Sequence, residues 1–416
     1  NCLSFSLSLM SLKLRSKNVW GRLGMGYETY RIADLIDEIA MGPFGSNIKV
    51  SCFVDSGVPV LNGSNLEGFS LSEKTFRYVT REKADSLNKA NAHRGDIVIT
   101  HRGTLGQIVF IPQDSKYDRY VISQSQFRVR CNDKVLPEYL VYYFHTPIGQ
   151  HKLLSNASQV GVPALARPSS TFQQIEVVLP ELSIQKRVVE IISTIQKKIV
   201  NNQELNDNLA DLLQTIYQER FVNDILAVNQ GVLSDICSYS RDKVAVSELN
   251  IRTYFSTENM LSGKAGSTEA TSLPTTSQTT ACHKGDTLIS NIRPYFKKIV
   301  YCEDKCGCST DVLCFTPSQP CYSAYLFSTL YADKFFAFMV AGSKGTKMPR
   351  GDKQQIMTYP VVLPSEEELA GFNTIASPLL EQIYSNRAEN KRLSILRDTL
   401  LPKLMSGEIN VSAVQL

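Results

Sequence analysis

The sequence lacks any long apolar run, and it has few histidines and little net charge. No stretch of ~18 uncharged apolar residues occurs, so no membrane-spanning helix is predicted. Lysine and arginine total 44 against 40 acidic residues, a net charge of +4, which excludes a polybasic coating of nucleic acid but allows local basic patches. With 43% hydrophobic residues in 416, the chain can build real cores, and its length predicts two or three domains.

Motifs of the common catalytic centres are also missing. The loop Gly342–Lys347 lacks the spacing of a phosphate-binding GxxxxGK[ST] motif, and no [ND]PP[YF] tetrapeptide or GxSxG elbow occurs. The five histidines form no HExxH pair. We therefore expect a chain that is not itself an enzyme. Two alternatives stay open: an enzyme that acts alone, and a scaffold with no sequence preference.

The ten cysteines allow two interpretations. Five of them lie close together, at Cys302, Cys306, Cys308, Cys314 and Cys321. Their spacings form no paired CxxC knuckles and no histidine lies nearby, so reduced thiols are favoured over a zinc site. No metal is therefore predicted in this chain.

The first residues do not have the order of a secretion signal. A short apolar run in 1–10 precedes Lys13, Arg15 and Lys17, whereas a signal peptide has its charges first. We interpret 1–26 as a disordered or upstream lead. With no secretion signal, a cytoplasmic location is expected.

The chain contains an internal repeat. Val177–Pro180 recurs as Val361–Pro364, 184 residues later, and this offset then holds without gaps for about forty residues. Upstream, Arg94–Ile99 resembles Lys284–Ile289 at an offset of 190 residues. The sequence therefore predicts a tandem duplication of a unit of about 185 residues, in which a globular half precedes a long helix.

Each globular half is predicted to be an α+β domain, because several short strands precede a helix in both. In the first half the strands are predicted at 96–100, 107–111 and 125–129, followed by a helix at 138–144. In the second half they are predicted at 287–290, 298–301 and 312–315, followed by a helix at 324–331. The predicted segments are a lead at 1–26, a first domain at 27–178, a long helix at 179–228, a second domain at 229–362 and a second long helix at 363–410.

The two long helices carry a heptad pattern of apolar residues, interrupted in each by one asparagine. The predicted seams are Ile191, Ile195, Asn202, Leu209 and Leu212 in the first helix, and Ile375, Leu379, Asn386, Leu393 and Leu396 in the second. Each helix is about 57 Å long at ~1.5 Å per residue. The simplest partner for one seam is the other, with the asparagines fixing the register, although each helix could instead pack only on its own globular half.

Several loops combine cations, amides and small residues, which are the side chains that contact bases and phosphates. For any one residue, a solvated loop charge is the alternative explanation, but two copies of such loops on a rigid spacer favour a bipartite ligand. The candidate residues for DNA binding are Ser46, Asn47, Lys49, Asn62, Asn65, His101, Arg102 and Thr104 in the first half, and Asn291, Arg293, Lys297, Lys298, Lys344, Lys347 and Arg350 in the second.

These features together resemble the specificity subunits of type I restriction-modification systems over residues 27–412. The matching stretches are Gly42–Lys49, Gly57–Asn65, Arg94–Pro112, Ile122–Gln124, Leu179–Gln185, Tyr254–Met260, Ser290–Lys298 and, most specifically, Leu396–Ile409. One departure is Pro364–Glu368, where the family usually has a Pro-Leu-x-Glu-Gln start to the helix.

The resemblance implies two target-recognition domains, each reading half of a split sequence in double-stranded DNA. It implies that the long helices pair as an antiparallel coiled coil that sets the gap between the half-sites. It also implies two modification subunits, which use S-adenosylmethionine for adenine-N6 methylation, and restriction subunits, which use ATP and magnesium. No cofactor is expected in this chain.

Overall fold

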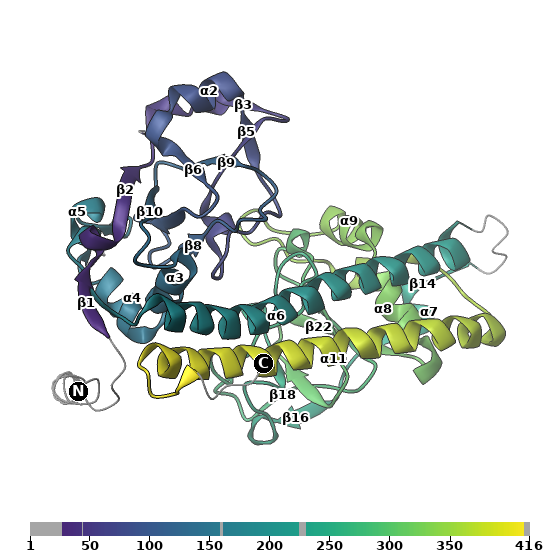
Figure 1. The fold of residues 1–416 in the computed structure, drawn as a ribbon. Helices are drawn as coiled ribbons and strands as arrows, with labels where there is room; N and C mark the ends of the chain where they lie inside the picture. Colours follow the sequence, from purple (N-terminus) through teal and green to yellow (C-terminus); the bar gives the residue numbers. More distant parts are fainter. Residues whose placement is uncertain (1–26, 44, 159–160, 224–229, 412–416) are drawn as a thin grey trace. The chain divides into compact units, whose positions relative to one another are not determined.

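The computed structural model describes residues 27–411 except 44, 159–160 and 224–229 (Figure 1). The predicted lead at 1–26 lies outside the described residues. The chain forms two compact units: unit 1 combines 1–198 with 392–416, and unit 2 comprises 199–391. Each long helix therefore contributes one half to each unit, whereas the segments predicted from the sequence keep each helix whole. Within the described part of the chain, no helix has the length and apolar character needed to cross a membrane.

Unit 1 contains two β-sheets in which most neighbouring strands run antiparallel. The first has the order β2-β10-β7-β8 and the second the order β3-β5-β4-β9-β6, while β1 pairs with β13 and β11 with β12. Their bounds are β1 Glu28–Arg31, β2 Ile36–Met41, β3 Phe53–Val54, β4 Val58–Val60, β5 Arg77–Val79, β6 Asn91–His93, β7 Ile97–Thr100, β8 Ile108–Phe110, β9 Arg119–Val121, β10 Gln126–Cys131, β11 Ala157–Ser158, β12 Ala164–Leu165 and β13 Glu176–Leu179.

Unit 2 repeats the first of these sheets, whereas its second sheet has four strands where that of unit 1 has five. Its sheets have the orders β15-β22-β19-β20 and β16-β18-β21-β17, and β14 pairs with β23 as β1 pairs with β13. The bounds are β14 Gln230–Val232, β15 Cys237–Tyr239, β16 Lys243–Ala245, β17 Tyr254–Phe255, β18 Gln278–Cys282, β19 Thr287–Ser290, β20 Ile299–Tyr301, β21 Cys306–Cys308, β22 Val312–Pro317 and β23 Pro360–Val362. The predicted α+β class, with the predicted strands in both halves, is confirmed.

The helices that follow β10 in unit 1 recur after β22 in unit 2, whereas the short helix at 81–86 has no counterpart among the described residues of unit 2. The helices are α2 Arg81–Ser86, α3 Pro137–His145, α4 Pro147–Leu153, α5 Pro168–Gln173 and α6 Leu182–Tyr217, then α7 Leu233–Ile236, α8 Ser323–Tyr331, α9 Asp333–Ala341, α10 Lys353–Ile356 and α11 Glu366–Met405. Short 3-10 turns are η1 Ile32–Leu35, η2 Gly45–Asn47, η3 Val50–Cys52, η4 Gly63–Leu66, η5 Asn88–Ala90, η7 Val246–Glu248, η8 Pro294–Phe296 and η9 Pro320–Tyr322, and a π-helical turn η6, Gln218–Val222, continues α6.

The repeated turn before β7 and β19 shows how sequence fixes local structure. Asp96 Oδ2 accepts the His93 backbone N–H at 3.0 Å, and Asp286 Oδ2 accepts that of His283 at 2.8 Å. Between His93 and Asp96, Gly95 has a φ of +84°, in the left-handed region that glycine enters without a Cβ clash. The same Gly-Asp dipeptide therefore starts the central strand of both units.

The long helices start and stop at recognisable signals. Although Pro364–Glu368 departs from the family pattern, Ser365 and Glu368 form a reciprocal cap there. The Ser365 backbone N–H donates to Glu368 Oε2 at 2.7 Å, and the Glu368 backbone N–H donates to Ser365 Oγ at 3.3 Å. At the other end, Gly407 follows α11 with a φ of +67°.

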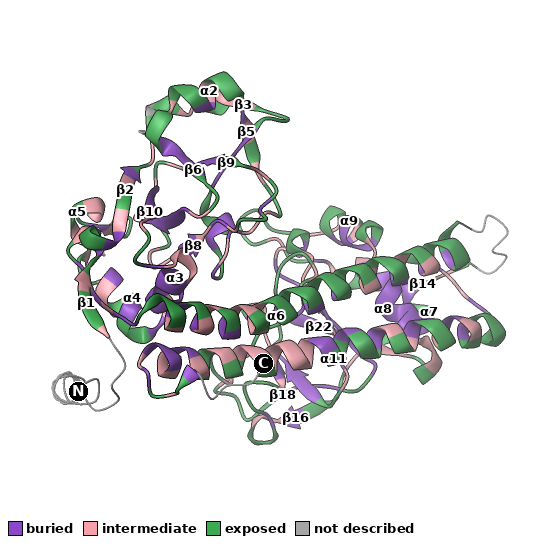
Figure 2. Ribbon diagram, viewed as in Figure 1, coloured by how far each residue is buried: buried purple, intermediate pink, exposed green. Residues whose placement is uncertain are grey.

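Both long helices help to build the cores of the units. In unit 1, Val188 and Ile192 of α6 share one core with Leu401 and Leu404 of α11. In unit 2, Leu213 and Tyr217 of α6 lie in one core with Leu369 and Phe372 of α11. Figure 2 shows the buried stretches along both helices. The helices therefore pair with each other and also pack on the globular parts of their units.

The buried seam differs in phase from the predicted one at three positions. Leu212, Ile375 and Leu396 are 48%, 37% and 47% exposed, and each directly precedes a residue that takes the inward position: Leu213, Ala376 and the half-buried Arg397. A straight helix has 3.6 residues per turn, so a strict heptad drifts off the contact line. Of the other predicted seam residues, Ile191, Asn202 and Asn386 are buried, and Ile195, Leu209, Leu379 and Leu393 are partly buried.

Four asparagines connect the helices inside unit 2. Asn202 Nδ2 donates to Asn390 Oδ1 at 2.9 Å, and Asn386 Nδ2 donates to Asn206 Oδ1 at 2.9 Å. Because a later residue of α6 meets an earlier residue of α11, the helices run antiparallel. Buried amides tolerate few other partners, so these pairs fix the register of the two helices.

Candidate nucleic-acid interface

In unit 1 a glycine-containing loop follows β7 and is held by two other segments. The His101 backbone N–H donates to Ser125 O at 2.9 Å, and the Gly103 backbone N–H donates to Pro163 O at 2.8 Å. Gly103 has a φ of +94° and open space where a Cβ would stand. The loop thus presents Arg102 and Thr104, both exposed, on a backbone fixed from two sides.

Unit 2 has the same loop pair after β19. The Asn291 backbone N–H donates to Asp311 O at 2.8 Å, and the Arg293 backbone N–H donates to Pro349 O at 2.7 Å. Arg293 therefore takes the place that Gly103 has in unit 1, with a φ of +50°. A left-handed conformation costs a non-glycine residue roughly 1–2 kcal/mol, and the hydrogen bond to Pro349 helps to hold it.

A second loop contacts the first in each unit. Gln107 Nε2 donates to Gly63 O at 3.0 Å, and at the equivalent place Lys298 Nζ donates to Thr257 O at 2.6 Å. Burial lowers the pKa of Lys298. The candidate residue Lys298 therefore anchors a loop, and its ammonium group is not directed to solvent as a free cation.

Asn65, another candidate, is also an internal brace. It is 1% exposed, and its Nδ2 donates to the carbonyls of Ser72 and Thr75, both at 3.0 Å. Asn259 does the same in unit 2, where its Nδ2 donates to the carbonyls of Tyr254 and Thr268. The amide holds the loop closed, and no part of it is exposed for a base edge.

The other candidates fall into three groups. The exposed ones for which the described part of the structure gives no ion pair are Asn47, Lys49, Asn62, Arg102, Thr104 and Lys347. Three cations have acidic partners: Lys297 with Asp333 at 3.0 Å, Lys344 with Asp352 at 2.5 Å and Arg350 with Asp311 at 3.0 Å. Asn291 is buried, and the side chain of Ser46 lies outside the description.

His101 contributes a hydrogen bond from a partly buried ring. Its Nε2 lies 3.1 Å from Gln124 O, and burial lowers the pKa of the ring below its ordinary value of 6.5. Gly45 also lies beside Gln124, because a Cβ on Gly45 would come within 2.2 Å of Gln124 Oε1. Gln124 is thus a shared neighbour of His101 and Gly45.

Exposed apolar side chains lie beside the basic ones, and the sequence did not single them out. In unit 2 these are Tyr295 and Phe296, whose ring centroids are 4.8 Å apart, and Met348, which is 50% exposed. In unit 1 Val162, 56% exposed, precedes Pro163 as Met348 precedes Pro349. The repeated position could have been found by aligning the two prolines that hold the loops.

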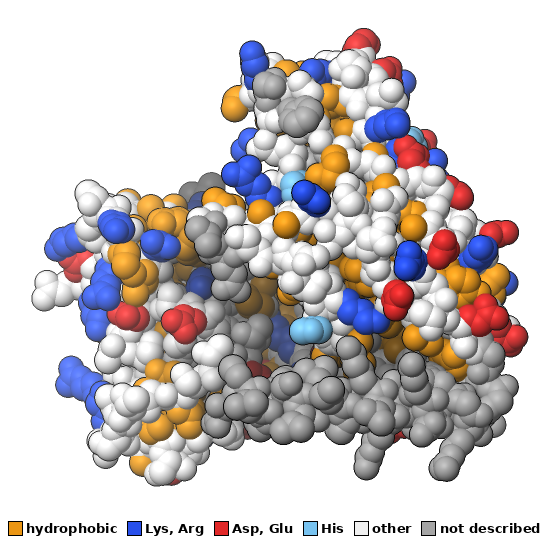
Figure 3. Space-filling view, turned by 90° about the vertical axis from the view of Figure 1, so that its left-hand side faces the viewer, with side chains coloured by type: hydrophobic (Ala, Val, Ile, Leu, Met, Phe, Trp, Pro, Cys, Tyr) orange, Lys and Arg blue, Asp and Glu red, His pale blue; other side chains and the backbone are white. Residues whose placement is uncertain are grey.

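The charge on the surface is mixed. On the face drawn in Figure 3, lysines and arginines are spread among acidic and apolar side chains and form no continuous basic surface. Strong, sequence-independent attraction to phosphates needs many cations together. The described residues on this face therefore do not form a general polyanion-binding surface.

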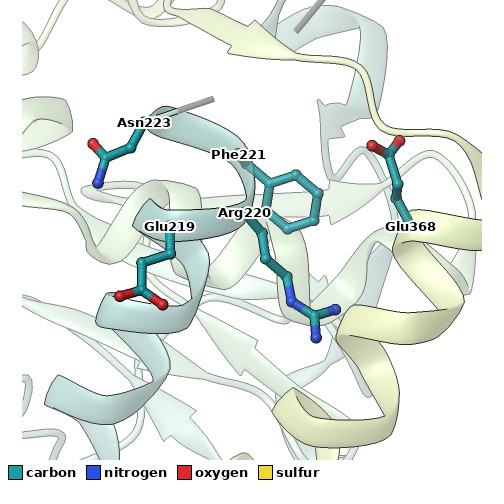
Figure 4. Close-up of a pocket in the computed structure, with 5 residues that line it drawn as sticks. All are labelled: Glu219, Arg220, Phe221, Asn223 and Glu368. Atoms are coloured by element: carbon teal, nitrogen blue, oxygen red, sulfur yellow. The ribbon is translucent and has the colours of Figure 1, made fainter. Parts of the chain in front are cut away.

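One cavity of about 480 Å³ lies where the π-helical turn meets α11 in unit 2. Figure 4 shows Arg220 and Phe221 pointing from the end of α6 toward the helix that carries Glu368. Glu219 also lines this cavity, so carboxylates outnumber the guanidinium group. Such a lining does not favour a phosphate group.

The clustered cysteines lie in the core of unit 2. Cys302, Cys306, Cys308 and Cys314 are buried there with Cys282, whereas Cys321 is only partly buried and lies outside the cluster. The nine cysteines that the structure describes form no disulfide. Within the same described ranges, no group of histidine, cysteine and acidic side chains has a geometry that could hold a metal ion.

Known proteins share the sequence pattern and the fold of this chain. Residues 26–210 match the family model described as the type I restriction modification DNA specificity domain. The specificity subunit of the MjaIX type I restriction enzyme from Methanocaldococcus jannaschii is 20% identical, with 94% of this chain and 95% of the relative covered. The S subunit of a type I restriction-modification system from M. genitalium has the same fold, with a TM-score of 0.56 at 15% identity, covering 92% of this chain and 96% of that one.

The matched domain, the full-length relative and the shared fold agree with each other. Residues 26–210 match the DNA specificity domain of type I restriction-modification systems, and nearly the whole chain is similar to a specificity subunit of such a system.

Proposed function

We propose that the chain reads a bipartite DNA target, with one half-site contacted by the loops of each unit. The observation that carries this proposal is the repeated loop pair, in which Gly103 is held by Pro163 and Arg293 by Pro349. Two similar reading sites in one chain suit a target with two parts. The exposed candidates Arg102 and Lys347 supply the guanidinium and ammonium groups that contact bases and phosphates.

The strain at Arg293 supports a role for its side chain. A glycine takes the equivalent place in unit 1, so the fold does not require arginine there. A residue held in an unfavourable conformation is often retained for function. We assign Arg293 to base or phosphate contact in the second half-site, with Tyr295, Phe296 and Met348 as apolar neighbours.

The chemistry is assigned to partner subunits. We propose that two modification subunits supply S-adenosylmethionine-dependent methylation of adenine N6, and that restriction subunits supply the ATP- and magnesium-dependent reactions. The target adenine would leave the helix and enter the modification subunit, because a base cannot react while stacked. On this proposal the chain is non-catalytic, and its paired helices separate the half-sites and dock the partners.

The test is to express the chain with its modification partner and map the methylated adenines. A bipartite motif is expected. Replacing 232–360 with the corresponding segment of a relative is expected to change one half-site and leave the other intact, since each loop pair lies within one unit. A continuous motif, or changes in both half-sites, would contradict the proposal. Methylation by the purified chain alone would instead favour an enzyme, and the absence of any motif a scaffold.

A pair of substitutions separates reading residues from braces. Arg102→Ala is expected to weaken DNA binding by the assembled modification complex about tenfold, for a loss of ~1–3 kcal/mol, with the melting temperature unchanged. Asn65→Ala removes three hydrogen bonds of a buried side chain and is expected to lower the free energy of unfolding by ~1–3 kcal/mol. Fluorescence-anisotropy titration and thermal melting measure the two effects. Equal loss of binding with no loss of stability in both variants would show that Asn65 is also a contact residue.

A further inference from the structure

A cavity of about 520 Å³ lies inside unit 2, away from the loop pair. It is bounded by the turn at 283–286, by β20 and β22, and by α8 and α11. Its lining is largely apolar but includes three carboxylates, Asp286, Glu303 and Glu381. The basic residues in the lining are Lys284 and His283.

Three buried polar atoms in this lining lack a hydrogen-bond partner. They are Glu303 Oε1, Thr316 Oγ1 and Asn373 Oδ1. The amide nitrogen of Asn373 already donates to Cys321 O at 2.8 Å, which leaves its oxygen as an acceptor. Asn373 Oδ1 can only accept hydrogen bonds, and so can Glu303 Oε1 when the carboxyl group is ionised. Thr316 Oγ1 belongs to a hydroxyl group, which can accept or donate. A buried group without a partner is costly, so the cavity is suited to a hydrogen-bond donor.

The internal repeat shows which donor has this place in unit 1. In the central sheets, Val129 pairs with Ile97, and Phe315 pairs with Thr287. The next residue on β10 is Arg130, and the next on β22 is Thr316. Thr316 therefore stands at the position where unit 1 has an arginine.

That arginine binds the repeated aspartate. Arg130 Nε lies 2.9 Å from Asp96 Oδ1, and Arg128 also reaches Asp96, at 3.4 Å. In unit 2 the equivalent Asp286 is 1% exposed. Its carboxylate receives the Cys314 thiol at 3.2 Å and the His283 backbone N–H, with the His283 ring 3.7 Å away, but no arginine of the described chain.

The charges near the cavity favour a cation. Asp286, Glu303 and Glu381 face Lys284 and a histidine in the lining. Burial raises the pKa of Glu303, and Lys284 and Arg387 act against that rise. The cations already present therefore do not compensate the burial of this carboxyl group.

We propose that this cavity binds a guanidinium group, at the position that the side chain of Arg130 takes in unit 1. A planar guanidinium has five N–H donors and can form paired hydrogen bonds with a carboxylate. Asp286 and Glu303 supply the charge, and Thr316 and Asn373 supply further acceptors. The group comes either from a small guanidinium compound or from an arginine side chain of a partner protein.

Titration of the full chain with ethylguanidinium, followed by calorimetry and thermal melting, tests this site. Binding with a Kd of roughly a millimolar is expected for so small a ligand. Ethylurea, which is neutral and of similar shape, is expected to bind at least tenfold more weakly. Equal responses to the two compounds, or no response to either, would overturn the proposal and leave a cavity that holds water.

Two substitutions localise the effect. Thr316→Arg supplies the missing guanidinium from the chain and is expected to raise the melting temperature and abolish the response to ethylguanidinium. Ser272→Arg adds the same charge at an exposed position. It is expected to change neither the melting temperature nor the response to ethylguanidinium. Glu303→Gln is expected to weaken ethylguanidinium binding about tenfold, and it decides the matter if the arginine variant does not fold. An undiminished response in both cavity variants would place the ligand elsewhere.

The source of the group is found by assembly with the modification subunits. If ethylguanidinium competes with their binding to this chain, the group is a partner arginine. If assembly is unaffected, the site takes a small compound. Both outcomes depend on the binding measured above, and they do not depend on which DNA sequence the loops recognise.

Discussion

Leu401→Ala is expected to lower the free energy of unfolding of unit 1 by ~2–5 kcal/mol, the usual cost of removing a buried leucine side chain. Leu401 lies at the end of α11 and is 3% exposed. It belongs to the core that also contains Ile97 and Phe127 of the central sheet. A substitution about three hundred residues further along the chain should therefore loosen the strands that contain Ile97 and Phe127.

Hydrogen exchange measures this effect unit by unit. The backbone amides of β7 and β10 in unit 1 are expected to exchange faster in the Leu401→Ala variant, and those of β19 and β22 in unit 2 to stay protected. Leu396→Ala is the matched control: the same substitution in the same helix, at a residue that is 47% exposed. If the two variants lost stability equally, or if unit 2 alone lost protection, the assignment of this helix end to unit 1 would be wrong.

Inserting one heptad into each long helix is expected to widen the gap in the methylated motif by about three base pairs. Seven residues add ~10.5 Å at ~1.5 Å each, and one base pair occupies ~3.4 Å. The insertions are placed after Gln196 and before Arg397, which face each other through a hydrogen bond of 2.9 Å within unit 1. A heptad nearly restores the phase of the seam and leaves the asparagine pairs untouched.

Mapping methylated adenines in cells that carry the variant and its modification partner gives the new gap. Both half-site sequences are expected to stay the same, because neither loop pair is altered. Inserting seven residues into one helix alone is the control, since it breaks the pairing and should abolish modification. A fixed gap in the double insertion would refute the spacer role while leaving the two-part recognition intact.

The duplication was the feature that sequence predicted best. An offset that holds over about forty residues predicted both long helices, and the repeated Gly-Asp turn predicted the central strands. The phase of the seam was less predictable, because Leu212 and Leu213 are adjacent and equally apolar. Only packing against α8 and α11 in unit 2 decides which of the two is buried.

The sequence predicted which loops form the candidate interface better than it predicted which of their residues are exposed for contact. Asn65 and Arg102 are both polar residues in loops, so residue type alone does not distinguish them. Their difference is in the hydrogen bonds that Asn65 makes to Ser72 and Thr75, seven and ten residues away. Lysines behave similarly: Lys298 is bound to the carbonyl of Thr257, whereas Lys347 is exposed. Local sequence does not contain these partners.

The division of the long helices has a consequence for the order of folding. Unit 2 is continuous in sequence, but the core of unit 1 needs Leu401 and Leu404 from the far end of α11. Chains are synthesised from the N-terminus, and domains fold as units when their residues are available. Unit 2 has all its residues first, so the half of the protein that leaves the ribosome earliest is the last to complete its core.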